Sequence, residues 1–163
     1  MRAFVNPVAL YEQVPVWVFT GRERVAEYAV RTSQLGVDLG VQGWLGEARL
    51  GAFAGTRDTF VRTGNLRLPE GRSDYYGAQL SLLADHLDAT DFPRDGYLLG
   101  LTARHEDVVR GTGAESRGYS NRVQIVAKKV ESWGPHSFSA LFRAGEGSEG
   151  VALNQAFSLG GFL

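Results

Sequence analysis

The chain of 163 residues contains no cysteine, which excludes disulfide bonds, a thiolate nucleophile and zinc sites built from thiolates. It also has no excess of charge, because 17 Lys and Arg residues stand against 18 Asp and Glu residues. With a net charge of −1, the chain lacks the excess of positive charge expected of a nucleic-acid binder. No segment approaches the roughly 18 apolar residues of a membrane-spanning helix. Asn6, Pro7 and Glu12 interrupt the apolar N-terminal stretch, so we expect no export signal there.

Glycine, in contrast, is abundant. The chain has 21 glycines, about 13% of its residues, where roughly 7% is usual. Aromatic residues make up 11% of the chain. This composition favours β-structure with closely packed turns over a helical bundle.

Apolar and polar residues alternate along six segments of the chain, and alternation with period two is typical of β-strands with one apolar face. These segments are 35–42, 47–54, 78–85, 97–104, 122–128 and 137–144. Weaker candidates lie at 3–9, 14–20, 26–30, 60–68 and 155–163. Turn clusters separate the segments, and no segment shows a sustained helical period. The sequence therefore predicts an all-β fold, a single antiparallel up-and-down meander of about eight or nine strands over residues 1–163.

Alternation alone leaves open whether the apolar face meets a protein core or lipid. Segments 75–88 and 119–131 exceed the roughly five or six residues of an ordinary strand and reach the roughly 9–11 that a tilted strand needs to cross a bilayer. The polar face carries charges at mid-strand, such as Asp38 and Arg49, which suits a wet lumen. Aromatic residues gather near strand ends, as in the interfacial girdles of membrane barrels: Trp44, Tyr75, Tyr76, Phe92, Tyr97, Tyr119 and Trp133. These features favour strands of a transmembrane β-barrel, and a soluble sandwich or lipocalin-like barrel is the alternative.

One segment carries a specific resemblance. The run Asp88-Ala-Thr-Asp91-Phe-Pro93-Arg-Asp-Gly96-Tyr97 resembles the hairpin signature of the bacterial surface-antigen barrels, the BamA/TamA-like superfamily of outer-membrane proteins. Four stretches support it, namely 2–8, 26–28, 35–40 followed by 46–51, and 157–162, and the last contains Gly160, Gly161 and Phe162. The chain is similar in particular to the barrel fused to patatin-like phospholipases. Without the resemblance, the residues alone predict a tight turn. Pro93 would fix φ, Gly96 would take a positive φ, and Asp91 and Asp95 would accept backbone hydrogen bonds.

The resemblance implies an internal fragment of a barrel of roughly 16 strands, anchored in the bacterial outer membrane. Its role would be structural, with no cofactor and no chemistry of its own, because the patatin domain is absent. The implied partners are membrane lipid, lipopolysaccharide, the outer-membrane assembly machinery, and the remainder of the barrel or a second copy. No nucleic acid is implied. The alternative functions are a soluble β-barrel that binds a small apolar ligand and, less favoured, a phospholipase on the barrel wall.

We predict no catalytic or metal site. Ser120 lacks the second glycine of a Gly-x-Ser-x-Gly elbow. The candidate bases of a wall lipase are His86, His105 and His136, each near a strand end, where a solvated histidine is the common case. The run His105-Glu106-Asp107 is not expected to hold a metal ion, because neighbouring strand residues point to opposite faces. Arg57, Arg62, Arg67 and Arg72 are expected to cluster around a hairpin near Pro69, on a solvated face that could contact lipopolysaccharide phosphates.

Overall fold

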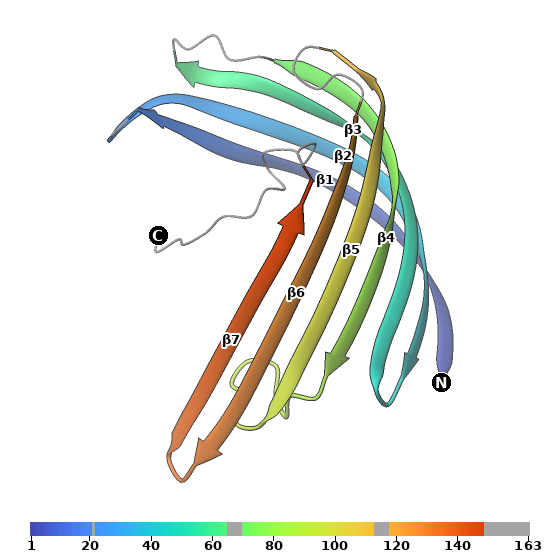
Figure 1. Cartoon of the computed structure of the whole chain (residues 1–163), viewed down its shortest axis with the longest axis vertical. Coiled ribbons are helices and arrows are strands. Elements are labelled where there is room, and N and C mark those ends of the chain that lie inside the picture. The colour runs from blue at the N-terminus through green and yellow to red at the C-terminus, as the bar shows by residue number, and fades with distance from the viewer. Residues whose placement is uncertain (21, 65–69, 113–117, 149–163) are drawn as a thin grey trace.

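The structure, a computed structural model, describes residues 1–20, 22–64, 70–112 and 118–148. These residues form one antiparallel sheet in which each strand pairs with the next along the chain. Its strands are β1 (Arg2–Thr20), β2 (Glu23–Gly43), β3 (Gly46–Gly64), β4 (Gly71–Asp85), β5 (Gly96–Gly111), β6 (Gly118–Trp133) and β7 (His136–Gly147). The sheet is curled like half of a barrel (Figure 1). The predicted all-β meander is confirmed, and the candidate strand at 155–163 lies outside the described residues.

The strands are longer than the alternating segments that predict them. Segments 3–9 and 14–20 join into β1, and segments 26–30 and 35–42 join into β2. Between the two parts of β2, residues 31–34 are polar on both faces, so the period-two contrast disappears. The backbone nevertheless stays paired with β1 and β3 through this stretch. Among the described residues no helix has the length and apolarity needed to span a membrane.

Short turns close the lower end of the sheet in Figure 1. Residues 44–45 join β2 to β3 beyond the pair Gly43↔Gly46, and residues 134–135 join β6 to β7 beyond the pair Trp133↔His136. A ten-residue loop, 86–95, joins β4 to β5 at the same end. The register is continuous except for irregularities at Val18/Phe19, Glu27/Tyr28 and Asp74/Tyr75. Continuous register keeps each side chain on one face along nearly the whole strand.

The register divides the side chains into an inner, concave face and an outer, convex face. Arg104 on β5 reaches Gln34 on β2, with 2.8 Å between its Nη2 and Gln34 Oε1. Side chains three strands apart can meet only on the concave side of a curled sheet. Most fully buried polar side chains belong to this inner face, whereas Leu35 and Leu39 on the outer face are 70% and 59% exposed. The sheet therefore buries polar groups inside and exposes apolar groups outside.

Glycines on the inner face make room for aromatic rings of the neighbouring strand. Phe53 lies directly opposite Gly77, and Tyr75 lies opposite Gly55. A Cβ atom at Gly77 would lie 2.5 Å from Phe53 Cζ, and one at Gly55 would lie 2.8 Å from the Tyr75 hydroxyl. A ring that covers a glycine in this way stabilises a strand position that is otherwise weak. This packing gives a physical reason for part of the high glycine content.

Candidate functional site

The outer face carries a continuous apolar band across all seven strands. It includes many of the most exposed apolar side chains of the described structure, such as Val5 at 65%, Leu50 at 60% and Phe138 at 64%. The outer apolar band consists of Ala3, Val5, Pro7 and Ala9 on β1; Leu35, Val37, Leu39 and Val41 on β2; Ala48, Leu50, Ala52 and Ala54 on β3; Tyr76, Ala78, Leu80, Leu82 and Ala84 on β4; Tyr97, Leu99, Leu101 and Ala103 on β5; Val123, Ile125 and Ala127 on β6; and Phe138, Ala140, Phe142 and Ala144 on β7.

The band crosses the sheet obliquely. On β2 its upper end is Leu35, but on β7 its upper end is Ala144, which lies in the same row of paired residues as Val41. The upper boundary thus descends six residues (35 to 41) over the five steps from β2 to β7, or about 1.2 residues per strand. With a rise of about 3.3 Å per residue and strands about 4.8 Å apart, this slope corresponds to strands tilted by roughly 40° from the normal to the band.

Polar and aromatic side chains border the band. Ser33, Thr56, His105 and Asn121 lie just above it on their strands, and Lys129 lies just below it on β6. Aromatic side chains exposed at its two borders are Tyr11, Tyr76 and Tyr119 above, and Trp44, Tyr97 and Trp133 below. The predicted aromatic positions therefore fall at the band's borders, with two exceptions. Tyr75 is only 2% exposed and lies on the inner face, and Phe92 lies in the loop 86–95.

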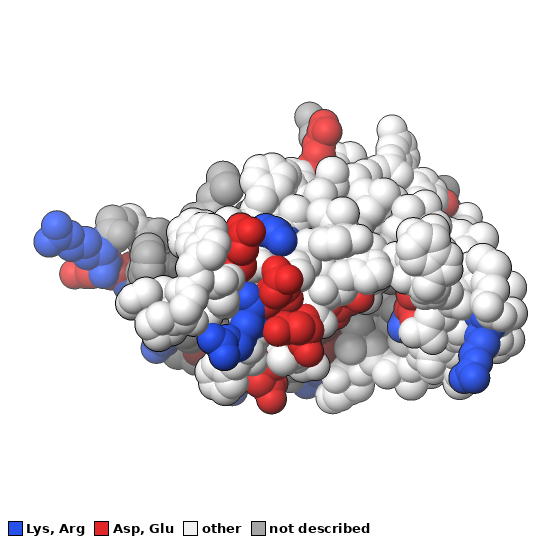
Figure 2. Space-filling view, turned by 90° about the horizontal axis from the view of Figure 1, so that it is seen from below, with Lys and Arg blue, Asp and Glu red and all other residues white. Residues whose placement is uncertain are grey.

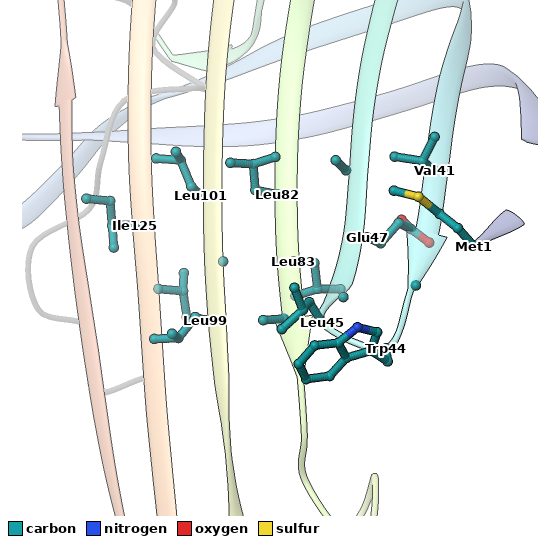
Figure 3. A pocket seen from close by; sticks show the side chains of 16 residues that line it. Met1, Val41, Trp44, Leu45, Glu47, Leu82, Leu83, Leu99, Leu101 and Ile125 are labelled. Atoms are coloured by element: carbon teal, nitrogen blue, oxygen red, sulfur yellow. The ribbon is translucent and has the colours of Figure 1, made fainter. Parts of the chain in front are cut away.

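A shallow groove of about 660 Å³ lies in the lower part of the band. Val41, Leu82, Leu99, Leu101 and Ile125 line it, and the turn that carries Trp44 and Leu45 borders it (Figure 3). Nearly all of its lining is hydrocarbon, so it suits an acyl chain better than a polar ligand.

The inner face holds a buried cluster that joins four strands. We call Gln34, Phe53, Arg57, Tyr75, Arg104 and Glu106 the inner arginine–glutamate cluster. Arg57 and Arg104 donate to the two carboxylate oxygens of Glu106 at 2.8 and 3.1 Å. The Arg57 and Glu106 side chains are each 3% exposed, and that of Arg104 is 11% exposed. Buried ions are tolerated only when paired, so these residues depend on one another.

Aromatic rings complete this cluster. The Arg57 guanidinium lies 4.7 Å from the centre of the Tyr75 ring, and that of Arg104 lies 3.7 Å from the centre of the Phe53 ring. The Tyr75 hydroxyl is 3.4 Å from Gln34 Oε1. Each of these three contacts joins side chains of different strands, so the cluster holds β2 to β5 in their curved arrangement.

The predicted cluster of loop arginines does not form among the described residues. Arg57 points into the inner face instead, while Arg62 pairs with Glu27 at 3.0 Å and Arg72 with Asp58 at 3.7 Å. Arg67 lies outside the described residues. The prediction is wrong for Arg57, which lies within β3, because the alternation that marks a strand is weak above the apolar band.

The histidines do not assemble a catalytic triad in the described part of the chain. His105 Nδ1 lies 2.7 Å from Asn121 Oδ1, and its Nε2 lies 3.1 Å from Asp107 Oδ2, all on the outer face. This places a candidate base beside an amide that could orient it, but the second contact is a carboxylate, not an alcohol. Glu106 points to the opposite face, as strand geometry requires.

The other two histidines are set apart from His105. The His86 ring lies 4.9 Å from the Tyr97 ring, and His136 begins β7 opposite Trp133. Ser120 is 8% exposed and lies on the inner face. Within the described ranges, no group of three or more His, Asp or Glu side chains could hold a metal ion.

The loop 86–95 is organised by Asp88. Its Oδ1 accepts hydrogen bonds from the backbone N–H groups of Arg94 at 2.8 Å and Asp95 at 3.2 Å. The N–H groups of Asp95 and Arg94 lower the pKa of the Asp88 carboxyl below its ordinary value. The sequence predicts that Asp91 and Asp95 accept these backbone hydrogen bonds, but in the structure the acceptor is Asp88. Gly96 has a φ of 116°, which favours glycine, and packs against the His86 carbonyl.

The same loop is joined to the neighbouring hairpin. Arg94 Nη2 donates to the Gly134 carbonyl at 3.1 Å, and the Ser132 hydroxyl donates to the Arg94 carbonyl at 2.7 Å. Asp95 pairs with Lys129 at 3.7 Å. Seen from this end, acidic and basic side chains lie side by side (Figure 2).

Pro93 and Phe92 line a polar cavity of about 630 Å³ between the loop and the inner face of β6 and β7. Of the motif residues, Asp88 and Pro93 lie in this loop, and Gly96 and Tyr97 begin β5 directly after it. Gly160, Gly161 and Phe162 lie outside the described residues.

Comparisons with known proteins returned no match among models of protein families, among curated proteins or among solved structures.

Proposed function

We propose that this chain forms part of the wall of a bacterial outer-membrane β-barrel, where it anchors the protein and carries out no chemistry of its own. The observation that carries the proposal is the oblique outer apolar band. Membrane barrels have strands tilted by about 35–45° and an outward apolar band about 25 Å tall, bordered by aromatic girdles. A tilt of roughly 40° follows here from the register, independently of any assumption about a membrane.

The height of the band agrees with this proposal. On β4 the band runs from Tyr76 to Ala84, and on β2 from Leu35 to Val41. At the derived tilt these stretches span about 15–20 Å along the band normal, before the width of the terminal side chains is added. This is close to the apolar thickness that a membrane barrel presents to lipid.

The inner face supports a wet lumen rather than a ligand pocket for an apolar molecule. A soluble barrel that binds an apolar ligand needs apolar side chains inside and polar ones outside. Here Arg57, Arg104 and Glu106 point inward while the apolar side chains of the band point outward. The soluble-barrel alternative is therefore the less favoured one.

The resemblance to the surface-antigen barrels fused to patatin-like phospholipases narrows the proposal further. It rests on the run Asp88–Tyr97, whose residues hold the loop between β4 and β5 in a defined shape. The partners under this proposal are outer-membrane lipid and lipopolysaccharide, the assembly machinery of that membrane, and further strands that complete the barrel.

The proposal is tested by locating the polypeptide in its source cell. An antibody against this segment is applied to soluble, inner-membrane and outer-membrane fractions on a denaturing gel. We expect a band several-fold heavier than 17.8 kDa in the outer-membrane fraction, and we expect it to resist extraction with alkaline carbonate. A band at 17.8 kDa in the soluble fraction would contradict the proposal and favour the autonomous soluble barrel.

A further inference from the structure

The two outer strands of the sheet differ in their capacity to pair. In the described structure β1 and β7 each have one neighbour, so each has one free edge. β1 contains Pro7 and Pro15, whereas no residue of β7 is a proline. Proline has no N–H to donate, so its position decides which edge of β1 is affected.

Both prolines direct their nitrogen to the free edge of β1. In an antiparallel pair, alternate residues turn their N–H and C=O groups toward the partner and away from it. The two-residue turn after Gly43 makes Gly43↔Gly46 a hydrogen-bonded pair, so odd-numbered residues of β2 face β3 and even-numbered ones face β1. The register pairs even-numbered residues of β1 with even-numbered residues of β2. Pro7 and Pro15 are odd-numbered, and the free edge therefore lacks two donors.

The free edge of β7 has a complete set of donors. The N–H of Ser148, the residue after β7, donates to the carbonyl of Asn121 on β6 at 2.9 Å. The even-numbered residues of β7 therefore turn their N–H and C=O groups toward β6. The odd-numbered residues of β7, such as Ser139 and Arg143, therefore present N–H and C=O groups to the free edge. Both faces of β7 also continue the pattern of the sheet, with Phe138 and Phe142 outside and Ser139 and Arg143 inside. A long unprotected edge of this kind is a template for a further strand.

We propose that the free edge of β7 binds one more antiparallel β-strand, and that the free edge of β1 is a seam that pairs only in part. This inference rests on the proposed membrane location, because lipid leaves no water to satisfy an open edge. The strand that pairs with β7 must alternate apolar and polar residues, with its apolar residues on the same face as Phe138 and Phe142. The slope of the band places its apolar stretch about one residue lower than that of β7.

The direction of the strands excludes the seven strands of a second copy as this partner. β1 and β7 are both odd members of an up-and-down sheet, so they run in the same direction. A second copy inserted in the same orientation offers its own β1 or β7 edge, and both run parallel to β7. Neighbouring strands in outer-membrane barrels are antiparallel. The occupant is therefore a further strand of the same barrel that runs opposite to β7, and closing the wall with antiparallel pairs requires an odd number of added strands.

Matched proline substitutions test the two edges in the full-length polypeptide, folded into phosphatidylcholine vesicles. Ser139→Pro removes an edge-facing donor from β7, and Ala9→Pro removes one from β1, both without touching the internal ladder. Ser139→Ala controls for the lost hydroxyl, and Ala140→Pro, whose nitrogen faces β6, marks the effect of breaking an internal pair. The readout is the fraction of the protein that migrates as a compact, faster species when the sample is not heated before the gel.

We expect Ser139→Pro to reduce the compact fraction at least tenfold and Ala9→Pro to change it by less than twofold. Equal effects of the two variants, or a larger effect of Ala9→Pro, would overturn the proposal. A wild-type protein that fails to enter vesicles would instead contradict the membrane location.

Discussion

The two faces of the sheet reverse the usual arrangement of a water-soluble domain. Leu39 on the outer face of β2 is 59% exposed, whereas Arg57 on the inner face of the adjacent β3 is buried. In soluble proteins large apolar side chains are the ones most often buried, and arginine is buried only when paired. The difference teaches that paired charges, and not apolar side chains alone, fill the inner face. The exposed apolar side chains of the outer face agree with the proposed contact with lipid.

The largest expected effect comes from breaking the inner arginine–glutamate cluster. Glu106→Ala leaves Arg57 and Arg104 buried without a carboxylate, which should lower the free energy of unfolding by about 3–5 kcal/mol. Urea titration of the vesicle-bound protein measures this change. Asp107→Ala is the matched control on the outer face of the same strand, and there we expect a loss below about 1 kcal/mol. Similar losses in both variants would show that the inner pairing does not stabilise the sheet.

A charge placed in the outer apolar band comes next. Leu39→Arg should cost roughly 2–4 kcal/mol if this side chain lies near the bilayer midplane. Asn6→Arg, on the inner face opposite Asp38, should change stability by no more than about 0.5 kcal/mol. Unfolding of both variants from lipid vesicles gives the comparison. Tolerance of Leu39→Arg would contradict the assigned orientation of the faces.

A smaller effect is expected where a ring covers a glycine. Gly77→Ala brings a methyl group against Phe53 and the His105 carbonyl, and such overpacking costs about 1–3 kcal/mol. Gly43→Ala is the control, because its Cβ would have no atom within 4 Å. Thermal unfolding of the two variants separates a packing requirement at Gly77 from a general cost of replacing glycine. Equal melting temperatures would remove the packing argument.

The smallest effect concerns the loop 86–95 and depends on pH. The folded loop lowers the pKa of Asp88, so its stabilisation is complete above the unfolded pKa of about 3.9 and is lost as pH falls through the lower folded pKa. Protection of the Arg94 and Asp95 amides from hydrogen exchange should therefore fall in acid. In Asp88→Asn this dependence should be absent. Retention of the same acid transition in the variant would assign it to another group.

Alternation was sufficient to predict the strands and the composition of each face within the outer apolar band. Above the band it failed, because both faces of residues 31–34 are polar and the pattern no longer marks a strand. For the same reason the sequence predicts Arg57 near a hairpin and Tyr75 in an aromatic girdle, whereas both lie on the inner face. The inner cluster could not be predicted, since Arg104 and Gln34 meet only through the curvature of four strands. The loop motif was recognised as a turn, but the aspartate that holds it is Asp88.

The most direct test of the central claim is spin labelling at single introduced cysteines, with any cysteine outside residues 1–163 replaced, because residues 1–163 contain no competing thiol. Labels are placed one at a time at residues 35–42 of the full-length protein in lipid vesicles, and collisions with oxygen and with a water-soluble nickel chelate are measured. We predict a period of two, with oxygen, which concentrates in lipid, favoured at Leu35, Val37, Leu39 and Val41, and the nickel chelate relatively favoured at the residues between them. Nickel accessibility that is high at Leu39 and its odd-numbered neighbours would contradict the claim that this face meets lipid.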